Sequence, residues 1–98
     1  MSDIRSTIGD RTWRMMTVPQ AVLGRGTRGD CDCPPGRHPT IRVSRSISDR
    51  LQLDTWIHEL LHACRPELDE AAVSDTASNI AKVLWKLGYR IPPDQAKQ

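Results

Sequence analysis

Two histidines four residues apart, with a glutamate directly after the first, carry the clearest chemistry in this 98-residue chain. The segment reads His58-Glu59-Leu60-Leu61-His62. Residues four apart lie one above the other on a helix, so both imidazoles can point at one metal ion. Glu59 is rotated from His58 by about 100°, which places its carboxylate beside the ion without ligating it. The motif therefore predicts a zinc site in which Glu59 takes a proton from metal-bound water.

A catalytic zinc ion needs a third protein ligand, and several side chains near the motif are candidates. They are Cys64, Glu67, Asp69 and Glu70 after it, and Cys31, Cys33 and His38 before it. We favour Glu70, because it lies about 60° from the centre of the apolar stripe on the helix that follows. The turn at Pro66 should fold that helix back towards His62. A separate structural site on the two upstream cysteines and His38 stays open as an alternative.

Two strands and a long loop are expected before the motif. Residues 12–18 mix β-formers with partial alternation, which is typical of a short strand. Residues 40–47 alternate apolar and polar side chains, and their exposed arginines suit a sheet edge. Between them, residues 19–39 are rich in Gly and Pro and have no helical period, which predicts a long loop.

Two helices are expected to position the candidate ligands. Asp54 is the expected N-cap of a helix over residues 55–64. Asp69 is the expected N-cap of a second helix that ends at Leu87, before Gly88. The apolar residues that recur at helical spacing predict its buried stripe: Val73, Ala77, Ile80, Leu84 and Leu87.

Length and composition predict one compact α+β domain over residues 1–98, with a frayed tail at 91–98. The sheet is expected to be small and antiparallel, packed on the helix with the motif and on the second helix. Hydrophobic residues make up 38% of the chain, so a bound metal would add stability to a modest core. The N-terminus lacks the apolar stretch of a signal peptide, and three cysteines fit a reducing compartment. We therefore expect a cytoplasmic protein with no membrane contact.

Charge is uneven along the chain. Residues 1–50 carry nine Arg and five Asp, a net charge of +4, whereas residues 51–98 carry a net charge of −2. Guanidinium groups suit phosphate partners, so a nucleic-acid-associated protein that grips phosphates with the segment from Arg25 to Arg45 is an alternative function. A solvated surface is the more common meaning of such a distribution.

The order strand, loop, strand, motif helix, turn and second helix resembles the zincin metallopeptidases. The likeness is carried by residues 54–63, which contain the HExxH motif, by Leu68-Asp69-Glu70-Ala71-Ala72-Val73 and by Leu87-Gly88-Tyr89-Arg90. Residues 40–90 look like small phage-type metallopeptidases, which are minimal gluzincins of SprT-like architecture. Glu70 follows His62 more closely than the third ligand does in thermolysin-like gluzincins, and position 68 is Leu where metzincins have a third His.

The resemblance implies a cytoplasmic zinc metallopeptidase, located in the host cell if it is phage-encoded. Its protein or peptide substrate would be hydrolysed with Glu59 as the general base. One zinc ion per chain would be bound by His58, His62 and Glu70. A zinc-stabilised interaction module without hydrolysis, its ion closed by Cys31 or Cys33, is the alternative.

The resemblance also implies where the substrate lies. In zincins, the strand before the active-site helix usually binds the substrate as an added antiparallel strand, and an unpaired strand edge can do so on physical grounds. Here this strand contains Ile41, Arg42, Val43, Ser44 and Arg45. Arg42 or Arg45 would then favour acidic substrate side chains. Candidates for stabilising the oxyanion near the metal are Tyr89, Arg90 and His38.

Overall fold

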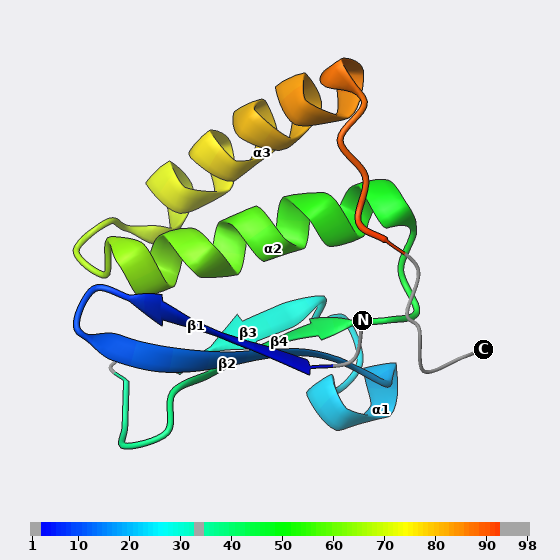
Figure 1. Cartoon of the computed structure of the whole chain (residues 1–98). Coiled ribbons are helices and arrows are strands. Elements are labelled where there is room, and N and C mark those ends of the chain that lie inside the picture. The colour runs from blue at the N-terminus through cyan, green and yellow to red at the C-terminus, as the bar shows by residue number, and fades with distance from the viewer. Residues whose placement is uncertain (1–2, 33–34, 93–98) are drawn as a thin grey trace.

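The computed structural model describes residues 3–32 and 35–92, and within them the chain forms three layers. A four-stranded sheet is the first layer, helix α2 (Asp49–Cys64) lies across one face of it, and helix α3 (Glu70–Leu87) packs on α2 on the side away from the sheet (Figure 1). The short helix α1 (Gln20–Leu23) lies against the other side of the sheet (Figure 1). The α+β class expected from the sequence is therefore confirmed.

The sheet is mixed rather than antiparallel as expected. Its strands are β1 (Asp3–Ile8), β2 (Arg11–Val18), β3 (Gly29–Cys31) and β4 (Thr40–Ser44), in the spatial order β1-β2-β4-β3. The outer pairs, β1 with β2 and β3 with β4, are antiparallel, whereas β2 and β4 run parallel. The parallel pair arises because residues 19–39 cross over through α1 and β3 and return the chain in its original direction.

Two of these strands were not predicted. β1 joins β2 through the two-residue turn Gly9-Asp10, in which Gly9 has a φ of +64°. β3 and α1 both lie within the range expected to be a loop. The two predicted strands, residues 12–18 and 40–47, are confirmed as β2 and β4, although β4 ends at Ser44, before the expected end at Ile47.

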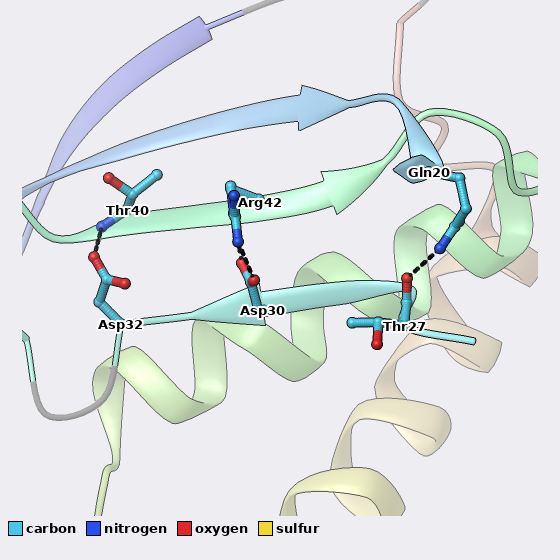
Figure 2. Close-up of polar contacts among 6 residues, drawn as sticks. All are labelled: Gln20, Thr27, Asp30, Asp32, Thr40 and Arg42. Atoms are coloured by element: carbon cyan, nitrogen blue, oxygen red, sulfur yellow. Dashed lines mark hydrogen bonds and ion pairs between the residues drawn. The ribbon is translucent and has the colours of Figure 1, made fainter. Parts of the chain in front are cut away.

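Polar contacts hold β3 beside β4. The guanidinium of Arg42 pairs with Asp30, with 2.9 Å between Nε and Oδ1, and the carboxylate of Asp32 accepts from the backbone N–H of Thr40 at 3.0 Å (Figure 2). Gln20 at the start of α1 donates to the carbonyl of Thr27 at 2.7 Å (Figure 2). A strand this short is thus fixed by its partners and not by its own sequence pattern.

The alternation of side chains divides the sheet into a closed face and an open face. On the closed face, which is covered by α2, apolar side chains form the core together with Trp56 of α2: Trp13, Met15, Ile41 and Val43. On the open face the side chains are largely polar and solvated, and α1 covers only its far end. The core therefore fixes α2, the helix that carries the histidine motif.

Helix α2 is longer than the motif pattern predicts. It begins at Asp49, where Ser48 is the N-cap and accepts from the backbone N–H of Leu51, and it ends at Cys64 as expected. Asp54, the predicted N-cap, instead lies inside the helix and accepts from the hydroxyl of Ser78 on α3 at 3.3 Å. The side chain expected to start α2 therefore connects the two helices.

Helix α3 has the predicted ends, and Val73 and Ala77 of the predicted stripe are fully buried, but the stripe differs from the prediction further along the helix. Asp69 caps it by accepting from the N–H of Ala72 at 2.7 Å, and Gly88 ends it with a φ of +99°. Ile80 and Leu87, which were expected to be buried, are 40% and 68% exposed, whereas Ala81, which was not in the predicted stripe, is buried. Small residues let α3 approach α2 closely, which turns the larger apolar side chains towards solvent. None of the described helices combines the length and the apolar character that crossing a membrane requires.

Candidate metal centre

The two histidines of the motif lie on one side of α2, near the turn that leads to α3. Their ring centroids are 4.9 Å apart and the ring planes are inclined by 69°. Potential ligand atoms of His58, Glu59 and His62 all lie within 4.8 Å of one another. The helical spacing of the motif thus produces the convergence of side chains that the sequence predicts.

Glu70, the first residue of α3, completes this group. Its Oε1 lies 3.0 Å from Nε2 of His58 and 2.9 Å from Nε2 of His62. In a tetrahedral zinc site with bonds of about 2.0–2.2 Å, neighbouring ligand atoms are about 3.3–3.6 Å apart. A small outward movement of the three side chains would therefore admit the ion. Two imidazole nitrogens and one carboxylate oxygen form a donor set that fits catalytic zinc.

The carboxylates of the two other acidic candidates for a third ligand are engaged elsewhere. The carboxylate of Glu67 pairs with the guanidinium of Arg65, and that of Asp69 caps α3. Cys64 is exposed at the end of α2. Glu70 is the side chain in this region whose carboxylate contacts both histidines.

The upstream candidates do not join the group either. Cys31 lies on β3, packed against the core, and Cys33 lies outside the described residues. His38 lines a different hollow, together with Arg37 and Thr40. Among the residues that the structure describes, the motif gives the one cluster of three or more His, Cys, Asp or Glu side chains that could hold a metal.

Glu59 is the most buried of the titratable side chains at this centre, with 7% of its surface exposed. Burial raises the pKa of its carboxyl, because removal from water disfavours the charged form, whereas His58 and His62 lower it. A divalent cation would act in the same direction as the histidines. A carboxyl held between these opposing influences is suited to accept and return a proton.

A hollow of about 350 Å³ opens directly over the centre. One wall is residues 26–29, which precede and begin β3, and the other wall is formed by α2 and α3, with His58, Glu59 and Glu70 exposed to it. A second hollow, of about 290 Å³, lies on the other side of the motif beside His62, with Ile8 and Trp13 among its lining residues. The centre therefore lies between two recesses.

Two residues of this site were not found by sequence reasoning. A Cβ atom on Gly29 would lie 2.7 Å from Cγ2 of Thr55 and 2.9 Å from the carbonyl oxygen of Arg42, so a glycine is needed for β3 to lie this close to α2. Arg28 lines the hollow over the centre. The concentration of glycines from Gly24 to Gly29 was the available signal for a close backbone approach.

The strand expected to bind the substrate is not a free sheet edge. β4 has β2 on one side and β3 on the other, so Ile41, Arg42, Val43 and Ser44 use their backbone groups within the sheet. The N–H of Arg45 is also taken, by the carbonyl of Val18 at 2.9 Å. Arg42, which was expected to bind acidic substrates, pairs with Asp30. β3, residues 29–31, is the outermost strand next to β4, so β3 and not β4 forms the sheet edge beside α2.

Two of the expected oxyanion stabilisers, Tyr89 and Arg90, lie far from the metal centre. Tyr89 and Arg90 follow the far end of α3, whose 18 residues place them about 27 Å from Glu70 along the helix axis. Arg90 lies over the ring of Trp85 at 3.4 Å and donates to its carbonyl oxygen. The helix that brings Glu70 to the metal centre therefore carries these two side chains away from it.

Comparisons of the chain with protein-family models, with curated proteins and with solved structures gave no match.

Proposed function

We propose that this protein is a zinc-dependent hydrolase of peptide bonds. The observation that carries the proposal is the contact of one Glu70 carboxylate oxygen with Nε2 of both His58 and His62, within 3.0 Å of each. Three protein ligands of this kind leave a fourth coordination position for water or substrate. Glu59, whose buried carboxyl belongs to the same cluster as the two histidines, would act on the water held there. A purely structural zinc site would have four protein ligands and would not need this carboxyl.

The chain's own residues supply the proton transfers. Bound zinc would polarise the substrate carbonyl and lower the pKa of water to about 7. Glu59 takes a proton from the attacking water as the new C–O bond forms, and it delivers that proton to the amide nitrogen as the C–N bond breaks. Arg28 lines the hollow, and its positive charge would stabilise the oxyanion in place of Tyr89 and Arg90.

An extended peptide is the substrate that suits the surroundings. The carbonyl of Arg28 and the N–H of Asp32 bond to β4, so the alternation of an antiparallel pair directs the backbone groups of Gly29 towards the free edge. A peptide added along this edge would pass His58 and His62, with the two hollows available for side chains on either side of the scissile bond.

Metal analysis and peptide cleavage, measured on the same preparations, test the proposal. Wild type and Glu59→Gln should each contain about one zinc per chain, whereas Glu70→Ala should contain less. Cleavage of a fluorogenic peptide library should be lost in Glu59→Gln and kept in Glu67→Gln, a matched control at an exposed glutamate. Equal zinc content in all variants would exclude Glu70 as a ligand. Zinc binding without any cleavage by the wild type would support the interaction module instead.

A further inference from the structure

A third hollow, of about 470 Å³, lies at the opposite face of the sheet from α2. Its charged and titratable lining residues come from β1, from the β1–β2 turn, from β2 and from the segment before β4: Arg5, Asp10, Arg11, Arg14, Arg37 and His38. Arg5 and Arg14 are cross-strand partners, and both point away from the face that carries Trp13 and Met15. The hollow is therefore a feature of the open face, separate from the metal centre.

Positive charge in this hollow exceeds negative charge. Arg14 pairs with Asp3 across the strands, with 2.9 Å between Nε and Oδ2, and Asp10 is the acidic residue of the lining. Even when both carboxylates are counted, the four guanidinium groups leave a net charge of about +2. Arg5, Arg11 and Arg37 form no ion pair with another residue that the structure describes. Arg11 donates from Nη1 to the backbone carbonyl of Gly36 at 3.4 Å, which leaves its other donors, and the guanidinium groups of Arg5 and Arg37, available to an anion.

We propose that this hollow binds the phosphate backbone of a nucleic acid. Guanidinium groups bind phosphate in a bidentate manner, and the hollow has space for more than one phosphate group. Its arginines come from β1, from β2 and from the segment before β4, so the positive charge of the hollow is shared by three parts of the chain. The lining contains Thr12, whose hydroxyl can also contact a phosphate, whereas the hydroxyl of Thr40 donates to the carbonyl of His38 at 3.2 Å. The lining has no Trp or Tyr on which bases could stack. These features favour binding that does not depend on base sequence.

The structure changes which arginines carry this function. The sequence suggested the segment from Arg25 to Arg45, but of that segment Arg37 is the arginine that lines the hollow, and Arg42 pairs with Asp30. Arg5, Arg11 and Arg14, which are distant in sequence from Arg37, complete the group. The hairpin of β1 and β2 is what brings them together.

Fluorescence anisotropy with a labelled single-stranded oligonucleotide and its duplex tests the proposal on zinc-loaded protein. The triple variant Arg5→Gln/Arg11→Gln/Arg37→Gln should bind at least about tenfold more weakly at low salt, with a salt slope smaller by about 2. The control Arg25→Gln/Arg45→Gln/Arg50→Gln loses the same three charges at exposed positions outside the hollow. It should lose less than about threefold. Equal losses in both triple variants, or no binding by the wild type, would overturn the proposal.

Competition distinguishes the sources of the anion. Unlabelled oligonucleotide should displace the probe, whereas millimolar inorganic phosphate and poly-L-glutamate of similar length should not. Displacement by inorganic phosphate would point to a small phosphate ligand, and displacement by polyglutamate would point to an acidic protein; either result contradicts the proposal. Zinc content and circular dichroism establish that each variant is folded. If the triple variant does not fold, Arg37→Gln with His38→Gln, in the segment before β4, gives the same test with two lining residues.

Discussion

The two faces of the sheet are built by different physical means. The closed face buries Trp13, Met15 and Val43 against α2, so it is held by apolar burial. The open face carries the solvated ion pairs of Arg14 with Asp3 and Arg42 with Asp30, which contribute little to stability. The stability of the fold therefore depends on the closed face, which leaves the open face available for binding. The candidate metal centre belongs to the first face, and the candidate phosphate site to the second.

Removal of zinc from the metal centre, which lies on the side of the closed face, should cause the largest change in the free energy of unfolding. If zinc is present at about a thousand times its dissociation constant, chelation should lower the free energy of unfolding by about 4 kcal/mol. Chemical denaturation with and without a chelator measures this change. Chelation should lower the free energy of unfolding of Arg5→Gln, on the open face, by as much as that of the wild type. It should lower that of Glu70→Ala much less, because this variant binds less zinc before the chelator is added. An unchanged chelator effect in Glu70→Ala would separate this residue from the metal.

Truncation of neighbouring residues on β4 compares the two faces directly. Ile41 is fully buried on the closed face, and the next residue, Arg42, is partly solvated on the open face. Ile41→Ala should cost about 3 kcal/mol, because it leaves a cavity against α2. Arg42→Ala should cost less than about 1 kcal/mol. Urea denaturation of the zinc-loaded proteins measures both, and similar costs would contradict the division of the sheet into two unequal faces.

Gly29 tests how closely β3 must approach the metal helix. Alanine at this position would press against Thr55 and the backbone of Arg42, so Gly29→Ala should cost about 2 kcal/mol and displace the wall of the hollow over the metal centre. Peptide cleavage should fall together with stability. Gly36→Ala is the matched control, because a Cβ there meets nothing within 4 Å. Normal cleavage by a destabilised Gly29→Ala would show that β3 does not form part of the substrate site.

The part of the site that lies on one helix could be predicted from the sequence, because helical spacing alone sets it. His58, Glu59 and His62 needed only the period of α2. Glu70 needed one further element, the turn after α2, and the N-cap at Asp69 was enough to place it. The ends of α3 were predictable for the same local reason.

The remaining features depend on which strands pair, and local patterns do not contain that information. β3 is a strand because β4 lies beside it, and its presence turned the expected edge strand into an internal one. The two-residue turn Gly9-Asp10 was a readable hairpin signal that would have revealed β1. Tyr89 and Arg90 were candidates because of their residue types, and the length of α3 places both far from Glu70.

The smallest expected effect concerns the cap that places Glu70. Asp69→Ala removes the acceptor for the N–H of Ala72 and should cost about 1 kcal/mol. Because Glu70 is the next residue, fraying of this turn should also weaken zinc binding, which competition with a chromogenic chelator measures. Asp69→Asn keeps a capping oxygen and should restore both quantities, although it removes the same charge. The affinity for oligonucleotide on the open face should be the same in both variants. The separate construction of the two faces implies that they are independent. If Asp69→Ala weakened oligonucleotide binding as much as zinc binding, the two faces would instead be coupled through the fold.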